Sequence, residues 1–250
     1  MNGLHFRGRH LINSMRIAIS GSSCQGKTTL IKDFLDEFST YKQPTTSYRS
    51  LIDGDNHSKQ TTIETQHKIL DFMAEQLQQF RSNDNIIFDR CPLDNMVYSL
   101  WANHHNKEGF DNEFIDKCIP LVRESMRFLD IIFFLPITAV SPVRIEPGDQ
   151  RESDQDYITE TDNLFKAMYQ QWLQPESNFF PKDDRPAIIE IFGKPQERVH
   201  MIKLYLDSET GDAIDEQGLL DVNEMEKIES QFRNPKDGYT DPNDVNKLLI

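Results

Sequence analysis

Cysteine and long apolar runs are both scarce in this sequence, and each scarcity excludes a class of protein. The three cysteines, Cys24, Cys91 and Cys118, are too few and too scattered for a disulfide framework or a zinc site. The longest apolar run, Ile131–Leu135, stops at Pro136 and is far too short to cross a membrane. We therefore expect a cytoplasmic protein without a membrane-spanning segment.

Positive charge is the other shortage. Lysine and arginine number 27 against 41 aspartates and glutamates, which gives a formal charge of −14 over 250 residues. A chain this acidic is repelled by the phosphate backbone of nucleic acids, so general nucleic-acid binding is not expected, although a local basic cleft is compatible with this balance. The 11 glycines and 12 prolines are ordinary numbers, so the chain is neither collagen-like nor wholly disordered, and 16 phenylalanines can fill a core.

Short β-type segments alternate with longer helical patterns along residues 15–206, which is typical of βαβ units around a parallel sheet. Strands are predicted at Arg16–Ser20, Thr45–Arg49, Asn85–Asp89, Asp130–Leu135 and Ala187–Phe192. Helices are predicted from the apolar stripe Leu30–Phe38 and over Ile63–Phe80, Asn112–Arg127 and Thr161–Leu173. The predicted fold class is therefore α/β, with a five-stranded parallel sheet flanked by helices in a three-layer sandwich.

Two segments are expected to lie outside this domain. Residues 1–14 contain Arg7 and Arg9 but no sustained apolar run, so we expect a flexible N-terminal arm rather than a secretory signal. Residues 207–250 hold 12 acidic and 4 basic side chains and contribute −8 to the net charge. Turn sequences such as Asn234-Pro-Lys-Asp-Gly recur there, and we interpret this part as an acidic C-terminal extension.

The strongest functional signal directly follows the first predicted strand. Residues 21–28 read Gly-Ser-Ser-Cys-Gln-Gly-Lys-Thr, which matches G-x-x-x-x-G-K-[ST] at every fixed position and opens a helix. In such a phosphate loop, backbone N–H groups bind the anion, Lys27 neutralises the β- and γ-phosphates, and the Thr28 hydroxyl holds Mg²⁺. We therefore expect ATP and Mg²⁺ as cofactors. The expected ATP-binding residues of this loop are Gly21, Ser22, Ser23, Cys24, Gln25, Gly26, Lys27, Thr28 and Thr29.

A second signal stands at the end of the third predicted strand, where Asp89 is followed by Arg90. Carboxylates at the carboxyl ends of parallel strands point into the ligand crevice. Asp89 could bind Mg²⁺ through a water or accept a proton from an attacking oxygen, and Arg90 could clamp a second phosphate in bidentate fashion. Lys27, Asp89 and Arg90 are therefore predicted to be catalytic, with Thr28 and Asp89 at the metal. The choice between base and metal ligand for Asp89 stays open.

The phosphate loop and the sequence Asp89-Arg90-Cys91-Pro92-Leu93-Asp94 together resemble the nucleoside and nucleotide kinase branch of P-loop proteins. Thymidylate kinases and phage-type deoxynucleotide kinases carry a similar Asp-Arg pair. The likeness is strongest to small kinases related to the ribosylnicotinamide-kinase domain of NAD-biosynthesis regulators, in which a strand ends in DR-x-P-x-D. The resemblance covers about residues 15–205 and implies a P-loop fold with ATP-dependent phosphoryl transfer.

The resemblance also implies a lid. In such enzymes an arginine-rich segment follows the fourth strand and closes over the phosphates. Here that place belongs to about residues 141–156, where prolines and a glycine indicate a loop. Arg144 is expected to bind ATP, and Arg151 is expected to reach the transferring phosphoryl group and stabilise its charge.

The acceptor and adenine sites follow from the same resemblance. Arg49 and Arg90 are expected to bind the acceptor, together with a glutamine of the preceding helix, which is Gln66 or alternatively Gln76. Pro195 belongs to the turn after the fifth predicted strand, over which the adenine lies in relatives.

Departures from the relatives leave the acceptor open. The segment Thr45–Leu51 lacks the Glu-Pro-Gly run of thymidylate kinases. Cys91 and Pro92 stand where the nucleoside-kinase motif has a serine. Neither a strict thymidylate kinase nor a strict deoxynucleoside kinase is supported.

The favoured interpretation is an ATP-dependent kinase whose partner is a small (deoxy)nucleotide or nucleoside acceptor, and a homodimer is compatible with it. One alternative is a kinase that acts on a nucleic-acid end or a modified base in DNA, with Arg7 and Arg9 compensating locally for the acidic chain. The other is a non-enzymatic nucleotide-dependent switch that presents residues 207–250 to a partner. A GTPase is not supported, because Asn246-Lys247 is followed by Leu-Leu rather than by the x-Asp of a base-reading motif.

Overall fold

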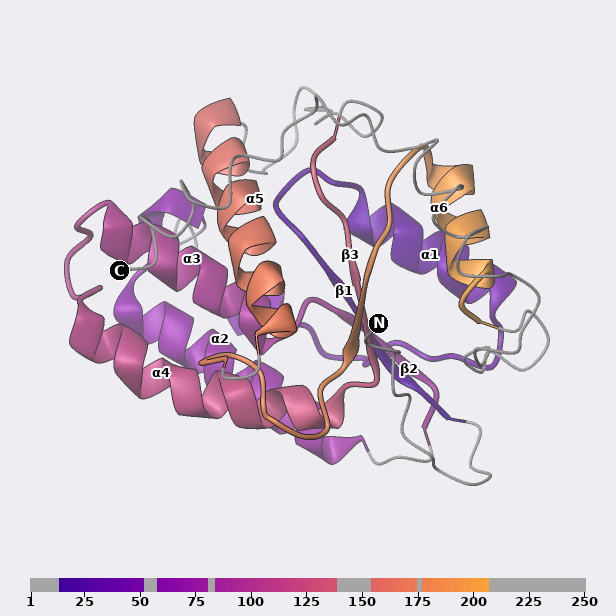
Figure 1. The fold of residues 1–250 in the computed structure, drawn as a ribbon, viewed down its shortest axis with the longest axis horizontal. Coiled ribbons are helices and arrows are strands. Elements are labelled where there is room, and N and C mark those ends of the chain that lie inside the picture. The colour runs from indigo at the N-terminus through magenta and orange to yellow at the C-terminus, as the bar shows by residue number, and fades with distance from the viewer. Residues whose placement is uncertain (1–13, 52–57, 81–83, 139–153, 175–176, 207–250) are drawn as a thin grey trace.

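The computed structural model describes residues 14–51, 58–80, 84–138, 154–174 and 177–206 (Figure 1). Its strands are β1 (Arg16–Ser20), β2 (Ile86–Asp89), β3 (Ile131–Phe134) and β4 (Ala187–Glu190). Its α-helices are α1 (Lys27–Glu37), α2 (Ile63–Gln79), α3 (Pro92–His104), α4 (Asn112–Ser125), α5 (Gln155–Gln170) and α6 (Pro195–Lys203). Short 3-10 turns form η1 (Tyr48–Leu51), η2 (Ser58–Gln60), η3 (Met126–Phe128) and η4 (Gln171–Leu173). The expected arm up to residue 13 and the acidic extension lie outside the described residues.

The four strands form one parallel sheet in the order β2-β1-β3-β4. Ile17 of β1 pairs with Ile87 on one side and with Ile131 on the other. Helices α1 and α6 cover one face of the sheet, and α2 to α5 cover the other (Figure 1). Every residue of β1 and β3 is buried, as expected for central strands covered on both faces. The predicted α/β sandwich is confirmed.

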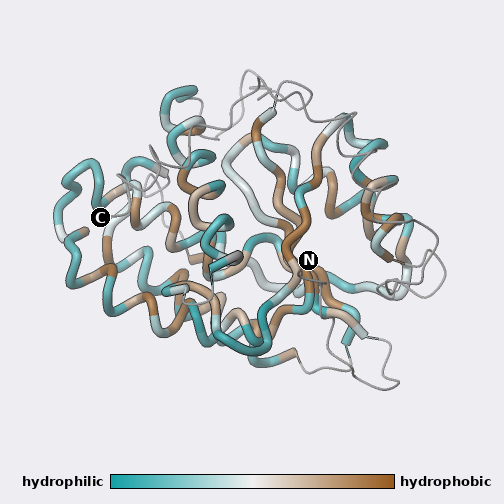
Figure 2. The backbone as a smooth tube through the Cα atoms, in the orientation of Figure 1, coloured by the Kyte–Doolittle hydropathy of each residue, from teal (hydrophilic) through white to brown (hydrophobic). Residues whose placement is uncertain are grey.

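Side chains of the sheet alternate between two cores, one on each face. Ile17 and Ile19 of β1 pack in the core that includes residues of α1 and α6, whereas Ala18 between them belongs to the core formed with α2 to α5. Figure 2 shows hydrophobic residues along the strands and polar ones on the outer sides of the helices. Because both faces are packed, the carboxyl ends of the strands are held firmly at one edge, where ligand-binding loops emerge in such sheets.

The prediction of a second strand at Thr45–Arg49 is wrong, and the described sheet has four strands rather than five. The chain contributes only an isolated bridge between Lys42 and Ile86 before it forms η1. Pro44 lacks the N–H group that a continued ladder needs. The Ser47 hydroxyl then accepts a hydrogen bond of 3.3 Å from the N–H group two residues later, which favours a turn over an extended strand.

The other predicted elements are present with shifted ends. Helix α5 begins at Gln155 rather than at Thr161, because the Asp154 side chain caps it by accepting a hydrogen bond of 3.0 Å from the Tyr157 N–H group. Residues 154–156 of the expected lid are therefore the cap and first turn of a helix rather than a loop. The rest of that lid, residues 141–153 with both of its arginines, lies outside the described residues. None of the described helices is long and apolar enough to span a membrane.

A buried ion pair on α5 fixes the chain where it leaves β3. The Asp162 carboxylate lies 2.8 Å from Lys166 Nζ and accepts a hydrogen bond of 3.0 Å from the Ile137 N–H group. Lys166 also donates to the Ile137 carbonyl at 3.0 Å. Burial raises the pKa of Asp162 to about 6, although the Lys166 ammonium acts in the opposite direction.

We expect the stability of the wild type relative to Asp162→Asn to fall as the pH rises. A carboxyl whose pKa is raised in the folded state stabilises the fold below its usual pKa of about 4, and this contribution is lost as the pH rises through the folded-state value. Asparagine cannot titrate, so urea unfolding of both proteins between about pH 4 and pH 7 isolates the titration of Asp162. A difference that instead grows with pH would show that Lys166 outweighs burial.

Candidate active site

The phosphate loop begins where β1 ends and finishes at the N-terminus of α1. Gly21 has a φ of +138° and Gly26 a φ of +75°, both of which glycine adopts without a steric penalty. A Cβ atom on Gly21 would lie 2.7 Å from the Leu135 carbonyl oxygen, so the loop can approach β3 this closely only with glycine there. The strand, tight turn and helix start that an anion-binding loop requires are therefore all present.

Lys27 is the first residue of α1, and its side chain is buried. Its ammonium donates a hydrogen bond of 2.9 Å to the Gly21 carbonyl and another to the Ser22 carbonyl. Burial lowers the pKa of Lys27 well below its usual value, and the Arg90 charge lowers it further, while Asp89 opposes both. An anion beside this ammonium would act in the opposite direction and favour its charged form.

Arg90 directly follows β2 in a left-handed backbone conformation, with a φ of +77°. For a residue with a Cβ atom this conformation costs about 1–2 kcal/mol. Nη1 donates to the Gly21 carbonyl at 3.0 Å and to Asp94 Oδ1 at 2.9 Å, while Nε donates to the Tyr48 hydroxyl at 3.0 Å. The guanidinium also lies 5.0 Å from the centre of the Tyr98 ring. These contacts offset the backbone strain and hold Arg90 against the phosphate loop.

Asp94 connects three parts of the site, and its side chain is fully buried. Oδ1 accepts hydrogen bonds from Arg90 and, at 3.4 Å, from the Gly21 N–H group. Oδ2 accepts one of 3.1 Å from the Cys91 N–H group, which is part of a capping box at the start of α3. Pro92 follows as the first residue of that helix. One carboxylate therefore joins the phosphate loop, Arg90 and α3.

Asp89, the last residue of β2, has one oxygen in an ion pair, while the other has no hydrogen-bond partner among the described residues. Oδ2 accepts a hydrogen bond of 2.7 Å from Nη1 of Arg49, whose side chain is half exposed on η1. Oδ1 is buried and makes no hydrogen bond with the described residues. Because a buried carboxylate oxygen without a donor is costly, this atom is ready to accept a proton, a metal ion or a ligand group.

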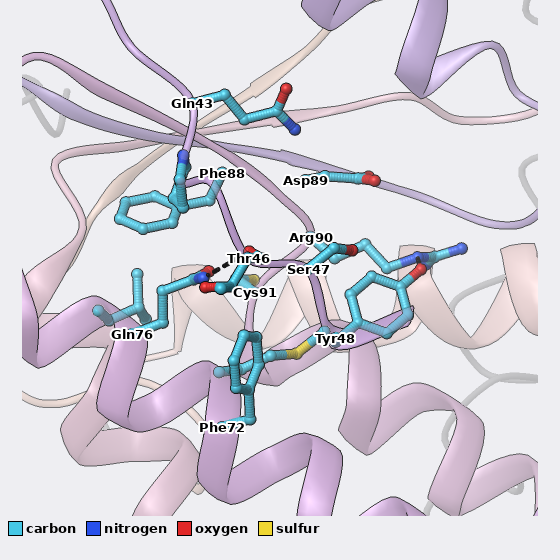
Figure 3. A pocket seen from close by; sticks show the side chains of 13 residues that line it. Gln43, Thr46, Ser47, Tyr48, Phe72, Gln76, Phe88, Asp89, Arg90 and Cys91 are labelled. Atoms are coloured by element: carbon cyan, nitrogen blue, oxygen red, sulfur yellow. Dashed lines mark hydrogen bonds between the residues drawn. The ribbon is translucent and has the colours of Figure 1, made fainter. Parts of the chain in front are cut away.

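A narrow pocket adjoins this carboxylate, between the segment that leads into η1 and helix α2 (Figure 3). Its lining combines aromatic and aliphatic side chains with hydroxyl, amide and charged groups: Gln43, Pro44, Thr46, Ser47, Tyr48, Phe72, Met73, Gln76, Leu77, Phe88, Asp89, Arg90 and Cys91. The cavity volume is about 30 Å³, which is room for about two water molecules. Small-molecule sites usually reach about 300 Å³ or more, so a ligand fits here only if the walls part.

The structure separates the two glutamines that were proposed for the acceptor site. Gln66 is buried on α2, where its amide donates to the Thr61 hydroxyl at 2.8 Å and accepts from Asn95 of α3. It is not among the residues that line the pocket. Gln76 does line the pocket, and its amide donates to the Thr46 carbonyl at 2.9 Å (Figure 3). Of the two, Gln76 is the one placed to meet a ligand.

The remaining predicted residues have varied surroundings. Thr28 and Thr29 are exposed in the first turn of α1, and Pro195 is the first residue of α6. Arg144 and Arg151 lie outside the described residues.

Three residues of the site, Asp94, Phe72 and Arg198, were given no role of their own from the sequence. The spacing of Cys91 and Asp94, from N-cap to third helical residue, is a signal that could have identified Asp94. Phe72, which lines the pocket, is indistinguishable in sequence from a helix core residue. The Arg198 guanidinium donates to the Gln25 carbonyl of the phosphate loop, which is 173 residues earlier in the chain. No local sequence pattern could predict this contact.

Comparison with known families agrees with this geometry. An AAA domain family matches residues 16–176. The chain belongs to that family. The matched region contains the phosphate loop, the pair Asp89-Arg90 and Asp94, and it ends before β4. No curated protein sequence matches the chain.

Solved structures of kinases share the fold of this AAA domain protein. Thymidylate kinase from Candida albicans aligns with a TM-score of 0.57 at 18% identity, over 81% of this chain and 95% of that chain. Deoxyadenosine kinase from M. mycoides aligns with a TM-score of 0.53 at 18% identity, over 75% and 96%. NadR protein in complex with NR aligns with a TM-score of 0.53 at 14% identity, over 82% and 54%. At these identities the likeness concerns the fold.

We expect Asp94→Asn to lower the free energy of unfolding by roughly 3–5 kcal/mol, because it leaves the buried Arg90 guanidinium without its counter-charge. Glu113→Gln is the matched control, since Glu113 and Lys117 form an ion pair at the same spacing on the exposed side of α4. Urea unfolding should show a large change for the first variant and almost none for the second. Equal changes would mean that the Arg90–Asp94 pair does not organise the site.

Proposed function

We propose that this chain is an ATP-dependent kinase that transfers the γ-phosphoryl group of ATP to a small nucleotide or nucleoside. The observation that carries the proposal is the position of Arg90. Its guanidinium bonds to the Gly21 carbonyl of the phosphate loop, and the same residue lines the neighbouring pocket. A phosphate on the loop and a molecule in the pocket would therefore meet at Asp89 and Arg90. Such adjacency of donor and acceptor is what phosphoryl transfer needs.

The phosphate loop supports ATP as the donor. Lys27 has its ammonium on the Gly21 and Ser22 carbonyls, and it can exchange these partners for β- and γ-phosphate oxygens. The start of α1 adds backbone N–H groups and the positive end of the helix dipole. Arg144, Arg151 and Pro195 remain proposed contacts of the same nucleotide.

The residues present fit Mg²⁺. The Thr28 hydroxyl is exposed in the first turn of α1, and Asp89 Oδ1 is a buried oxygen without a donor among the described residues. Hydroxyl and carboxylate oxygens are ligands that Mg²⁺ prefers. When bound, Mg²⁺ would neutralise charge on the β- and γ-phosphates, with Thr28 and Asp89 as the residues that hold it.

The chemistry of the pocket supports a nucleoside-like acceptor. Phe72 and Phe88 offer apolar surface for a flat base, Gln76 offers an amide, and Asp89 and Arg90 place charges at one end. A base with an attached sugar matches this gradient from apolar to charged. The similar folds of thymidylate kinase and deoxyadenosine kinase support the same acceptor class.

The protein's part in such a reaction is mainly positioning and charge stabilisation. An acceptor oxygen attacks the γ-phosphorus, and the bond to the ADP oxygen breaks. If Asp89 acts as the base rather than as a metal ligand, it takes the proton of an acceptor hydroxyl. Arg49 forms an ion pair with Asp89, and a ligand that binds this carboxylate would compete with the pair. Once free, Arg49 can bind the anionic part of the bound molecules.

Lys27→Ala should leave the fold intact and abolish ATP turnover, because this ammonium is the cation at the β- and γ-phosphates in the proposed complex. Lys32→Ala, at an exposed position of the same helix, is the control and should keep wild-type turnover. ADP release and circular dichroism of both variants provide the measurement. A Lys27 variant with at least half of the wild-type rate would contradict the assignment of the loop.

Asp89→Asn should lower kcat by at least ~100-fold, since either of its proposed roles needs the negative charge. ATP affinity should change much less, because the phosphates are held mainly by the loop. Asp71→Asn, at an exposed position of α2, controls for charge alone. A kcat within about threefold of wild type would remove Asp89 from the reaction.

The proposal as a whole is tested by a panel of acceptors. ADP release from ATP and Mg²⁺ is measured with common nucleosides, deoxynucleosides, their monophosphates and nicotinamide riboside. We expect at least one of them to raise the rate clearly above that of ATP alone. If only an oligonucleotide end raises ADP release, and if this effect weakens with added salt, the acceptor is a nucleic acid rather than a small nucleotide or nucleoside. Slow hydrolysis that nothing stimulates would favour a nucleotide-dependent switch.

A further inference from the structure

A phosphate-binding loop creates a problem on its outer side. Its N–H groups turn inward to meet the anion, so several of its carbonyl groups turn outward into the protein. A buried carbonyl without a donor is costly, and a loop with such a carbonyl would rotate that peptide and point the oxygen at the phosphate. The shape of the loop therefore depends on donors that hold its outward carbonyls.

Buried cations supply these donors at both ends of the loop. At the first end, the Gly21 carbonyl accepts from Lys27 at 2.9 Å and from Arg90 at 3.0 Å. At the second end, the Gln25 carbonyl accepts from Nη1 of Arg198. The Lys27 ammonium is the group that leaves for the phosphates in the proposed reaction, so the two guanidinium groups are the contacts that persist.

Arg198 is well fixed for such a role. Its side chain, on α6, is buried, and Nε donates a hydrogen bond of 2.9 Å to the Gly193 carbonyl in the turn that precedes the helix. Gly193 has a φ of +92°, and a Cβ there would lie 2.6 Å from Glu197 Oε2, so this turn is also tight. The Glu197 carboxylate accepts in turn from the Lys194 N–H group at 2.6 Å. The guanidinium therefore bridges a rigid turn and the phosphate loop.

Space around the contact is equally limited. A Cβ on Gly26 would lie 3.2 Å from Nη1 of Arg198, so glycine at this position lets the guanidinium come close to the loop. Burial lowers the pKa of Arg198 from its usual value, which reflects the cost of placing this charge among protein groups. Gln25 itself is buried, and its side-chain amide makes no hydrogen bond with the described residues. The backbone contact is therefore what ties Gln25 to α6.

We propose that Arg198 is a positioning residue that holds the second half of the phosphate loop in its nucleotide-binding shape. The inference rests on the proposed function only in that the loop binds a nucleotide. Without the hydrogen bond from Arg198, the Gln25 carbonyl could turn toward the bound phosphates and repel them. The acceptor pocket, which is lined from α2, β2 and the segment before η1, would be unaffected.

The test is the affinity for a fluorescent ADP with Mg²⁺ in wild type, Arg198→Met and Arg198→Lys. We expect about 10- to 100-fold weaker binding for Arg198→Met, as for the loss of a charged hydrogen bond, and a partial recovery for Arg198→Lys. Lys203→Met removes a partly exposed cation of the same helix, which pairs with Glu37, and should bind ADP like wild type. For Arg198→Lys, the KM for the acceptor should stay within about twofold of the wild-type value. A general loss of structure would instead raise this KM as well.

Competition by inorganic tripolyphosphate, which has no base, shows whether Arg198 acts through the phosphate loop or through the turn at Gly193. If Arg198 acts through the loop, competition by tripolyphosphate weakens by the same factor as ADP binding. Weaker ADP binding with unchanged tripolyphosphate competition would place the role at the turn and overturn the proposal, as would unchanged affinity for both. Should Arg198→Met fail to fold, Arg198→Lys carries the same comparison. A wild type that binds ADP but phosphorylates no acceptor would end the proposed function and leave this inference standing.

Discussion

The buried ion pair between Arg90 and Asp94 is the contact on which the geometry of the site depends. Two charges withdrawn from water are tolerated only when their remaining hydrogen-bonding atoms are also satisfied. Here both partners use Gly21 for that purpose: Arg90 bonds to its carbonyl, and Asp94 bonds to its N–H group. Gly21 is the residue at which β1 ends and the phosphate loop begins. Its contacts with Arg90 and Asp94 therefore fix the loop relative to the end of β2 and the start of α3. The phosphate loop and the neighbouring pocket are positioned relative to each other through these contacts.

Part of the conformational cost of the described residues lies in this same region. Arg90 and Cys24 have left-handed backbones without being glycine. The Ser22 hydroxyl, the Gln25 amide and Asp89 Oδ1 are buried without hydrogen bonds among the described residues. Such features lower stability unless a ligand or water meets them. The sheet beneath, with its two packed cores, supplies the stability that allows a site of this kind to exist.

The sequence predicted the parts of the molecule that depend on local pattern. The loop was found because its glycines, Lys27 and Thr28 are each required at a fixed position by contact with phosphate. The central strands were found because burial on both faces makes them continuously apolar. The prediction of a strand at Thr45–Arg49 was wrong. β-type residues there suggested an extended backbone, whereas Pro44 and the Ser47 hydroxyl favour a turn.

What stayed hidden depends on tertiary placement. Gln66 and Gln76 lie on one helix, and only the packing of α2 against α3 and the η1 segment shows that the second one meets the pocket. Arg198 finds its carbonyl partner across almost the whole length of the domain. No spacing in the sequence links such a residue to the loop, so its contact with the Gln25 carbonyl is visible only in the structure.

Reduction of the second strand to a single bridge at Lys42 has a consequence for how this protein can change over time. A full strand would tie the pocket wall to β2 by a ladder in which every residue supports the next. The wall is instead attached through separate side-chain contacts, such as Gln76 to the Thr46 carbonyl and Arg90 to the Tyr48 hydroxyl. Each of these can be replaced singly, without a shift in strand register. The lining of the pocket can therefore change through single substitutions in the wall while the phosphate loop stays as it is.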